Sequence, residues 1–512
     1  MHEIAPLSPA AAAQADFQPD RGPVALNGAA VFCGFAPRPL DGGFTWADFG
    51  CGLGITASIL AAANPQGRFF AIDADGQALA AGRALAKAAF LDNLTFLQAD
   101  YTKPHDLDLP PLDFAVLGNV LCWLDSQERQ ALLSRVCALL KPGGIVLATY
   151  DALPGAAALV PLRDLLFSVT AGQTANPLAR ARAAVDWLGA MRAADIDFFR
   201  DNPALGPRLD ALVERGPQAL AGRFFGGTLR PLHFAQVNAE MAAQGLTFAG
   251  RAEAFLNLID LAVPAALRPR LRAATSRAEV EATRDFIRNE DHRRDLYIKG
   301  AAPSDGAALT AFDDARILGP AAASGQATPG QADPEVSFGA VSLSFRGALF
   351  ESLLAALDLG PRAVGELCAS AALEGVPPGL IRDGLRLLIA GGLARPYARA
   401  ADVAPAAPPV WPLRLPHPLN RALALTLGLG GPTVALASKV LGDGVVMDNR
   451  DALLLVALCD AGPEGAVERA LAILADQAIP CGPATTQALT DRLAPLITDR
   501  LPWLRALGVV EG

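Results

Sequence analysis

Histidine and cysteine are scarce in this chain, and neither is grouped. The 512 residues include five histidines and seven cysteines, and no pair of them has the spacing of metal ligands. The common zinc and iron–sulfur patterns are therefore excluded, and we expect no metal site. Because the cysteines stand singly and their number is odd, we expect free thiols in a reducing compartment rather than a disulfide framework. They are Cys33, Cys51, Cys122, Cys137, Cys368, Cys459 and Cys481.

Long hydrophobic runs and a leader sequence are also lacking. Although 52 % of the residues are hydrophobic, no run of 18 apolar residues is free of charge, proline or glycine, so we expect no membrane-spanning helix. The first residues, 1–6, lack the basic and apolar regions that direct export. We therefore expect a cytoplasmic protein.

The chain has little of the positive charge that nucleic-acid binding requires. Its net charge is −9, and only the range 151–300 holds more basic than acidic residues, 19 against 17. Because binding to nucleic acid rests mainly on basic side chains, we expect no nucleic-acid partner.

The most informative stretch of the chain is a glycine-rich one, residues 44–54. Its sequence is FTWADFGCGLG: an apolar segment ends at Gly50, a turn containing Gly52 and Gly54 follows, and an apolar helical segment comes next. A glycine turn between a strand and a helix lets backbone N–H groups approach a ligand closely. The stretch therefore predicts a nucleotide-type binding loop.

Strands and helices alternate regularly from this stretch to residue 150, which predicts an α/β fold with a doubly wound, Rossmann-like sheet. The second strand ends at Asp73, an acid in position to bind the two hydroxyls of a ribose. Ligands of such sheets bind at the C-terminal ends of the strands, so site residues are expected there. The predicted strands are 45–49, 69–72, 94–98, 113–118 and 144–150, and the predicted helices are 54–63, 76–89 and 126–140.

The rest of the chain departs from this alternation. A helical insertion is predicted at 155–245, with loops at 171–177 and 215–231, and two strand-like pieces, 246–250 and 295–299, are expected to close the sheet as an antiparallel pair. Because a chain of 512 residues is too long to fold around a single hydrophobic core, several domains are expected. In chain order these are a disordered N-terminus 1–22, a ligand-binding catalytic domain 23–300, a linker 301–338, a winged-helix-like regulatory module 339–400 and a helical region 401–512.

The spelling of the glycine stretch is typical of one enzyme family. It is G-x-G-x-G with an acid, Asp48, two residues before the first glycine, and the ribose acid and the segments 96–100, 112–117 and 139–144 follow in order. This order resembles the class I S-adenosylmethionine-dependent methyltransferases. The alternative, a dinucleotide oxidoreductase, instead has G-x-G-x-x-G after a hydrophobic strand.

Further stretches narrow the resemblance. The segments 149–155 with 161–163, and 285–300, are similar to signatures of methyltransferases that carry a methyltransferase regulatory domain, and 418–420 with 435–438 is similar to that family's C-terminal region. The best-known members are bacterial protein-lysine methyltransferases, including those that act on rickettsial outer-membrane protein. The resemblance implies S-adenosyl-L-methionine as cofactor, lysine side chains of a protein as acceptor, and a homodimer.

The same resemblance implies two sets of site residues. Asp73 is expected to bind the ribose and Asp100 the adenine amino group. The expected cofactor-binding residues are Asp48, Gly50, Cys51, Gly52, Gly54, Asp73, Ala74, Asp100, Tyr101 and Gly118. The catalytic candidates, on the acceptor side, are Asn119, Trp123, Tyr150 and Asp151. Asn119 either directs its amide at the nucleophile or the methionine carboxylate, or caps the next helix, and Trp123 either forms a wall of the acceptor pocket or packs in the core.

The acceptor-side motifs depart from the family's pattern. The usual His-Gly-Val-aromatic-Ser-Trp is Gly-Asn-Val-Leu-Cys-Trp at 118–123, the usual Tyr-Asn is Tyr150-Asp151, and a His-Glu-Tyr-Leu-like segment is Gly-Arg-Phe-Phe at 222–225. Asp151 either holds or deprotonates a cationic amine, or is a turn residue. Two alternatives therefore stay open beside protein methylation: a paralogue that binds the cofactor without transfer and acts as a binding or regulatory partner, and a methyltransferase of a small molecule.

A basic cluster near the end of the predicted catalytic domain also has two interpretations. Arg288, Arg293 and Arg294 stand close to Asp285, Glu290 and Asp291 in the chain. The arginines either receive an acidic substrate or serve this chain itself, as a solvated face or as a set of ion pairs with these acids, and the second is the simpler hypothesis.

Overall fold

The structure is a computed structural model. It describes residues 17–101, 103, 107–172, 176–214, 216–225, 229–321, 334–339, 341–402, 409–426 and 433–512.

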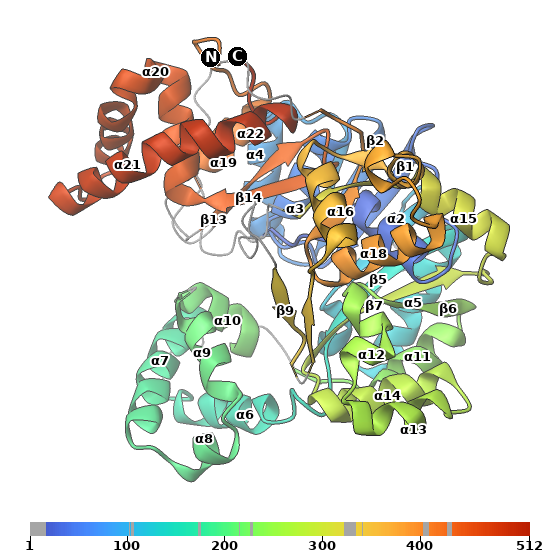
Figure 1. The fold of residues 1–512 in the computed structure, drawn as a ribbon. Coiled ribbons are helices and arrows are strands. Elements are labelled where there is room, and N and C mark those ends of the chain that lie inside the picture. The colour runs from blue at the N-terminus through green and yellow to red at the C-terminus, as the bar shows by residue number, and fades with distance from the viewer. Residues whose placement is uncertain are drawn as a thin grey trace.

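A seven-stranded sheet forms the centre of the catalytic domain (Figure 1). Its strand order is β3-β2-β1-β4-β5-β7-β6, with the first five strands parallel and β7 antiparallel to both β5 and β6. The predicted doubly wound sheet and its antiparallel closing pair are confirmed. The strands are β1 (Phe44–Phe49), β2 (Gly67–Asp73), β3 (Leu94–Gln98), β4 (Leu112–Gly118), β5 (Leu140–Asp151), β6 (Leu246–Arg251) and β7 (His292–Lys299).

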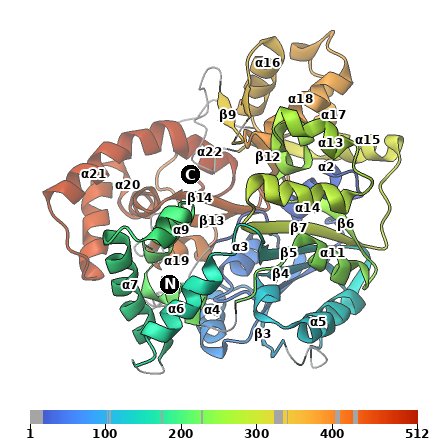
Figure 2. The ribbon, with the colours of Figure 1, turned by 90° about the horizontal axis from the view of Figure 1, so that it is seen from below.

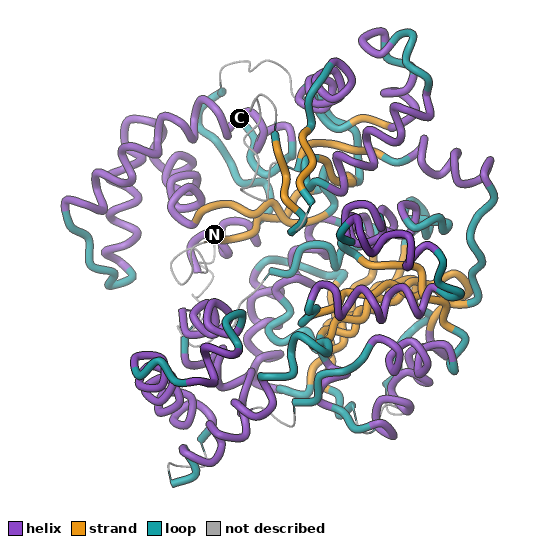
Figure 3. The backbone as a smooth tube through the Cα atoms, turned by 60° about the horizontal axis from the view of Figure 1, so that its bottom comes forward, coloured by secondary structure: helices purple, strands orange, loops and turns teal. Residues whose placement is uncertain are grey.

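Helices cover both faces of this sheet (Figure 3), because its side chains alternate between two apolar cores. In β1, Trp46 lies in one core with residues of α2, α3 and α4, whereas Ala47 lies in the other core with residues of α5 and α11. The helices are α2 (Pro23–Phe32), α3 (Ile55–Ala63), α4 (Gly76–Ala88), α5 (Ser126–Leu139) and α11 (Phe234–Ala242).

The predicted helical insertion forms a separate group of helices at the lower left of Figure 1, and Figure 2 shows it from below. The expected loop 215–231 is wrong in part, because Pro217 begins a helix of nine residues there. Proline is favoured in the first turn of a helix, where its missing N–H is not needed. The insertion consists of α6 (Leu159–Val169), α7 (Pro177–Ala193), α8 (Asp197–Asp201), α9 (Leu205–Glu214) and α10 (Pro217–Phe225).

Short helices join the two antiparallel strands β6 and β7. They bury a small apolar cluster of their own around Leu256 and Val263. They are η3 (Ala254–Asn257), α12 (Ile259–Ala262), η4 (Ala265–Leu267), α13 (Arg268–Arg272) and α14 (Arg277–Arg288).

The range 301–338, expected to be a linker, contributes instead to the following module. Helix α15 (Gly306–Ala315) and strand β8 (Ile317–Pro320) lie in it, and β8 is the central strand of a sheet with the order β11-β8-β12. The predicted winged-helix type stays a prediction. The module further contains β9 (Glu335–Ser337), β10 (Ser342–Ser344), α16 (Ala348–Asp358), β11 (Arg362–Ala363), α17 (Val364–Cys368), η5 (Ala371–Leu373), α18 (Pro378–Ala390) and β12 (Ala394–Tyr397).

The C-terminal region packs on the cofactor side of the catalytic domain. Residues of α3 and α4 share an apolar core with it. It is not helical throughout, since β13 pairs with β14 in an antiparallel hairpin. Its elements are α19 (Pro418–Thr426), β13 (Thr433–Ser438), β14 (Asp443–Asp448), α20 (Asn449–Asp476), which is interrupted at Gly462, α21 (Pro483–Pro495), η6 (Leu496–Arg500) and α22 (Leu501–Ala506).

Two features are absent from the part of the chain that the structure describes. None of the described helices combines the length and the hydropathy needed to cross a bilayer. The described residues also hold no group of three or more His, Cys, Asp or Glu side chains that could bind a metal ion.

Candidate cofactor and acceptor site

The glycine turn follows β1 at the point where the strand order reverses between β1 and β4. Gly50, Gly52 and Gly54 have φ values of 90°, 57° and 66°, which side chains rarely tolerate. A Cβ on Gly50 would stand 2.7 Å from the carbonyl oxygen of Gly118, at the end of β4. A Cβ on Gly52 would meet no described atom within 4 Å. The turn is thus packed tightly on its sheet side and open at Gly52.

Asp73 holds this turn from the end of β2. Its Oδ2 accepts a hydrogen bond of 2.7 Å from the backbone N–H of Gly52, and its Oδ1 accepts one of 3.0 Å from the N–H of Asp75. A carboxylate offers about four acceptor positions, so both oxygens retain the capacity to accept from ribose hydroxyls. Asp73 is half-buried and the adjoining Ala74 is exposed.

Tyr101 joins the turn to the second strand. Its hydroxyl accepts a hydrogen bond of 2.7 Å from the N–H of Gly50 and donates one of 2.8 Å to the carbonyl of Ile72, which also accepts from the N–H of Cys51. Burial raises the pKa of Tyr101 well above its usual value, so the hydroxyl stays protonated. Asp100 lies outside this network, with a side chain that is 54 % exposed and Lys103 at 3.8 Å.

Asp48 is a buried carboxylate that is only half satisfied. Its side chain is 1 % exposed, Oδ2 lies 3.4 Å from Nη1 of Arg21, and Oδ1 has no hydrogen-bond partner among the described residues. Burial raises the pKa of Asp48, although the neighbouring guanidinium opposes that shift. A buried acceptor without a donor costs free energy. Asp48 therefore has capacity for a cationic ligand group.

Asn119 stands at the end of β4, beside the turn. Its φ is 60°, its backbone N–H donates to Oγ1 of Thr149 at 2.9 Å, and its side-chain Oδ1 accepts from that hydroxyl at 3.2 Å. Thr149 therefore fixes the side chain by way of its oxygen. Trp123 closes the next short helix, η2 (Val120–Trp123), and is half-buried. The structure thus brings Gly118, Asn119 and Trp123 to the same edge of the sheet as the glycine turn.

Tyr150 does not share this position. Side chains alternate along a strand, so Tyr150 points to the opposite face of the sheet from Thr149. It is fully buried there and donates a hydrogen bond of 2.7 Å to Oδ2 of Asp295. The structure therefore does not place the Tyr150 hydroxyl at the acceptor side.

Asp151 reaches the acceptor side but is already paired. Nη1 and Nη2 of Arg223, on α10, donate to its two oxygens at 2.6 and 2.8 Å, and Nδ1 of His292 lies 3.9 Å away. Burial acts to raise the pKa of Asp151, but the neighbouring His292 and the hydrogen bonds from Arg223 outweigh it and hold that pKa below its usual value. A carboxylate of this kind is a poor base for an ammonium group.

Sequence reasoning missed two of the residues around this site. Arg21 lies in the range expected to be disordered, of which 1–16 lie outside the described residues. The signal that could have located it is the Gly22-Pro23 step, since proline is frequent at the first position of a helix. Arg223 was noted only as a departure from the family's pattern, and nothing in the sequence joins it to Asp151.

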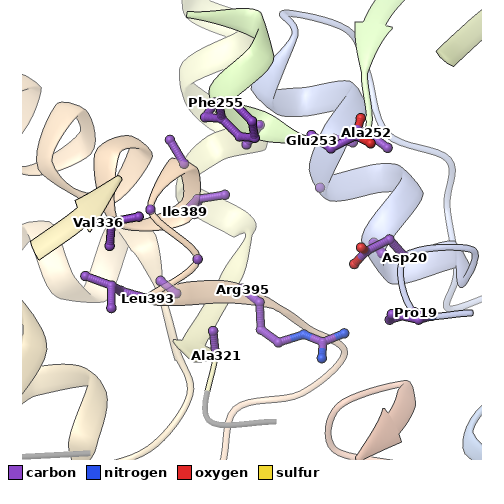
Figure 4. A pocket seen from close by; sticks show the side chains of 18 of the residues that line it. Pro19, Asp20, Ala252, Glu253, Phe255, Ala321, Val336, Ile389, Leu393 and Arg395 are labelled. Carbon is purple, nitrogen blue, oxygen red and sulfur yellow. The ribbon is translucent and has the colours of Figure 1, made fainter. Parts of the chain in front are cut away.

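A cavity of about 1360 Å³ lies next to the site, between the N-terminal segment, η3 and the C-terminal domains (Figure 4). No candidate cofactor or catalytic residue lines it. Asp20 and Arg294 do, and Nη1 of Arg294 lies 3.3 Å from Oδ2 of Asp20. Arg294 is also the cross-strand neighbour of Thr149 in the sheet. The cavity therefore begins close to the acceptor side.

The basic cluster predicted near residue 290 forms ion pairs within the chain. Arg293 is fully buried and contacts Glu281, Asp285 and Asp295. The other pairs are Arg288–Glu290, Arg294–Glu253 and Arg294–Asp20, with Asp291 bound to Arg208. The second hypothesis for this cluster is confirmed, although some of its partners differ from the predicted ones.

Two family models match the chain. The model of a "Methyltransferase domain" matches residues 47–146, which include the glycine turn and the ends of β1 to β4. The "Predicted methyltransferase regulatory domain" matches residues 217–299, from α10 to β7. This match lies within the range 23–300, and the regulatory role expected of the module 339–400 stays a prediction.

Comparison with known proteins extends this likeness over most of the chain. A curated relative, the uncharacterized protein sll1526 of Synechocystis sp., is 25 % identical over 418 residues, which are 82 % of this chain and 80 % of the relative. The solved structure of PKMT2 from Rickettsia typhi matches with a TM-score of 0.66 at 13 % identity, and that of PKMT2 in complex with AdoHcy with 0.69 at 14 %. Both comparisons cover 97 % of this chain and 100 % of the other. With the site geometry, the family models show that this chain is an S-adenosylmethionine-dependent methyltransferase with a methyltransferase regulatory domain.

Proposed function

We propose that this methyltransferase N-methylates lysine side chains of a protein. The observation that supports it best is the likeness of fold to PKMT2, which extends over 97 % of the chain and so includes the helical insertion and the C-terminal domains. The sequence signatures shared with protein-lysine methyltransferases point the same way.

The cavity beside the site is larger than most small-molecule sites. Small-molecule sites usually enclose roughly 300–1,000 Å³, whereas this cavity has about 1360 Å³. Its wall is rich in charged side chains, of which the arginines are Arg251, Arg288, Arg294, Arg395, Arg492 and Arg500.

The residues of the cofactor side fit S-adenosylmethionine. The glycine turn is open at Gly52, Asp73 retains acceptor capacity for ribose hydroxyls, and Oδ1 of Asp48 has no described partner. When bound, the cofactor supplies a methyl group on a sulfonium, which a nucleophile displaces. The protein then has to align the acceptor nitrogen with that methyl group.

The acceptor lysine has to react as the neutral amine. A free lysine has a pKa of about 10.4, and removal from water lowers it. Trp123 and Asn119 form this side, with Asn119 held by Thr149. The carboxylate of Asp151 is engaged by Arg223, so we assign the lowered pKa of the amine to desolvation, and the proton passes to bulk water before the amine is enclosed.

The proposal is tested in two steps. The first is isothermal titration of the full chain with S-adenosylmethionine and S-adenosylhomocysteine, with Asp73→Ala as the variant expected to lose binding. The second is incubation of a cell lysate with the enzyme and a methyl-labelled cofactor, followed by acid hydrolysis and chromatography of the labelled amino acids. Asp73→Ala serves again as the control for labelling by other enzymes.

Each outcome decides between the hypotheses. Label in mono-, di- or trimethyl-lysine of the protein fraction supports the proposal. Label only in the low-molecular-weight fraction shows a small-molecule acceptor instead. Tight cofactor binding without any labelled acceptor favours a paralogue that acts through binding alone.

A further inference from the structure

The segment 17–22 is attached to the cofactor side of the catalytic domain. The backbone N–H of Gln18 donates to Oγ1 of Thr56, in the first turn of α3, at 3.0 Å. The carbonyl of Arg21 accepts a hydrogen bond of 2.9 Å from Nε1 of Trp46, on β1. These two contacts fix the segment across the start of the helix that follows the glycine turn, and so fix the position of the Arg21 side chain.

The Arg21 guanidinium lies over the point where the strand order reverses. Its Nη1 is 3.4 Å from Oδ2 of Asp48 on β1, and 2.9 Å from the position that a Cβ on Gly118, at the end of β4, would occupy. Ligands of doubly wound sheets bind at such a reversal. Arg21 is therefore a basic group at the edge of the cofactor site, with a side chain that is only 12 % exposed.

The contact between Arg21 and Asp48 is long, and it leaves the Asp48 carboxylate incompletely satisfied. Charge-assisted N–H···O bonds are usually about 2.7–2.9 Å long, whereas this one measures 3.4 Å. Oδ1 of Asp48 is buried without a described partner. A buried carboxylate in this condition gains when a ligand supplies the missing donor, and a ligand that also carries an anion can bind the guanidinium beside it.

A ligand with both groups is already implied by the fold. The methionine part of S-adenosylmethionine ends in an α-ammonium and an α-carboxylate. Its ribose is expected at Asp73 on β2 and its methyl group has to face Asn119 after β4, so the methionine part lies near β1, which runs between those two strands.

We propose that Arg21 binds the α-carboxylate of the cofactor and that Oδ1 of Asp48 accepts from its α-ammonium. The ammonium and carboxylate of the cofactor then lie between the Arg21 guanidinium and the Asp48 carboxylate, which contact each other when no ligand is bound. This inference rests on the cofactor site and not on the proposed lysine acceptor, so either can fail without the other.

The test compares three ligands by isothermal titration of the full chain. S-adenosylhomocysteine has both charged groups, its decarboxylated form S-adenosyl-3-thiopropylamine has only the ammonium, and 5′-methylthioadenosine has neither. Arg21→Gln should weaken binding of the first by about ten- to a hundredfold, as expected on loss of charge-assisted hydrogen bonds. It should not weaken binding of the amine-only ligand, and it should change the affinity for 5′-methylthioadenosine by less than about twofold. Asp48→Asn should weaken the first two and spare the third.

Arg38→Gln is the matched control. Arg38, whose side chain is 20 % exposed, also pairs with a buried aspartate, Asp113, at 2.6 Å. Asp113 lies at the start of β4, at the opposite end of the strand from the site. The affinities of the Arg38→Gln variant for the three ligands should equal those of the wild type. Unchanged binding of 5′-methylthioadenosine by Arg21→Gln shows that the adenosine site is folded.

Three results would overturn the proposal. Equal weakening of all three ligands by Arg21→Gln would show a structural role only. Tighter binding of S-adenosylhomocysteine would show that Arg21 blocks the site. Absence of binding by the wild type would remove the cofactor assignment itself, whereas the lysine acceptor is judged separately by the labelled hydrolysate.

Discussion

Asp151 and Arg223 stand 72 residues apart in the chain and share two hydrogen bonds, of 2.6 and 2.8 Å, between the carboxylate and the guanidinium. Each position departs from the pattern of the methyltransferases that this chain resembles. Taken singly, the two departures suggest a site that has lost its acceptor chemistry. Because the two new residues are each other's partner, they are better understood as one joint change that attaches α10 to the end of β5.

The first prediction concerns this ion pair. Arg223→Ala leaves the Asp151 side chain, which is 6 % exposed, without its guanidinium, and removing one partner of a buried pair is costly. Since Arg223 itself is 23 % exposed, solvent screening reduces the loss, and we expect the free energy of unfolding to fall by about 1–3 kcal/mol. Methyl transfer should fall as well, whereas the affinity for S-adenosylhomocysteine stays unchanged. Urea denaturation measures the free energy of unfolding, and isothermal titration measures the affinity for S-adenosylhomocysteine.

A control and an exchange make this prediction specific. Arg192 and Asp210 form an exposed ion pair within the same insertion, and Arg192→Ala should cost less than about 1 kcal/mol. The double variant Asp151→Arg with Arg223→Asp should recover part of the stability lost in the single variants. If Arg223→Ala behaves like Arg192→Ala, the pair does not attach the insertion.

The cofactor half of the site was predictable from the sequence because local patterns encode it. The buried strand, the glycine turn and the acid after the next strand each follow from residues adjacent in the chain, and Gly50 and Asp73 lie where this pattern puts them. Short elements without a periodic pattern were not predictable. Strand β8 has four residues, including Gly319 and Pro320, and obtains its place from pairing with β11 and β12.

The rest of the site depends on contacts between distant residues, which no local pattern reports. The pairing of Asp151 with Arg223 and the position of Arg21 over Asp48 are of this kind. Tyr150 was assigned to the site because it ends a strand next to Asp151. Side chains alternate along a strand, so Tyr150 lies on the face of the sheet opposite to Thr149. That Thr149 is the residue on the Asn119 side is known only from the contact between their side chains, which the sequence does not show.

The second prediction separates structure from catalysis at Tyr150. Tyr150→Phe removes the hydroxyl that donates to the buried Asp295 at 2.7 Å, so an acceptor loses its donor. We expect a loss of about 1–3 kcal/mol in the free energy of unfolding. The affinity for S-adenosylhomocysteine and the kcat of methyl transfer at a temperature where the variant is folded should stay within about twofold of the wild type. A drop in kcat of more than tenfold without loss of stability would restore Tyr150 as a catalytic residue.

The third prediction compares two glycines of the same turn. A Cβ at Gly50 would stand 2.7 Å from the carbonyl oxygen of Gly118, whereas one at Gly52 would meet no described atom within 4 Å. Both residues have positive φ, so alanine is strained at either, at a cost of about 1–2 kcal/mol. Gly50→Ala adds a collision with backbone and should be destabilised clearly more than Gly52→Ala. Thermal unfolding of both variants checks the order, and equal melting temperatures would contradict the packing described for the turn.

The fourth prediction concerns the pH dependence of stability. Glu281 is fully buried and contacts Arg284, Arg293 and Arg277. Burial acts to raise its pKa, but the three guanidinium groups outweigh burial and lower that pKa from 4.5 to about 2. A carboxyl whose pKa is lower in the folded than in the unfolded state stabilises the fold above its unfolded pKa. That contribution is lost as the pH falls from 4.5 towards 2.

Glu281→Gln keeps the shape of the side chain and removes its charge. At pH 7 the variant should be less stable than the wild type by about 3 kcal/mol, the equivalent of a shift of between two and three pKa units. As the pH falls below 4.5 the wild type loses this advantage, so the difference between the two unfolding free energies should narrow. Glu279→Gln, an exposed position on the same helix, should differ from the wild type by less than about 1 kcal/mol. Urea denaturation at pH 7, 5, 4 and 3 measures the trend, and a difference that stays constant over this range would show that the charge of Glu281 is not what its arginine partners require.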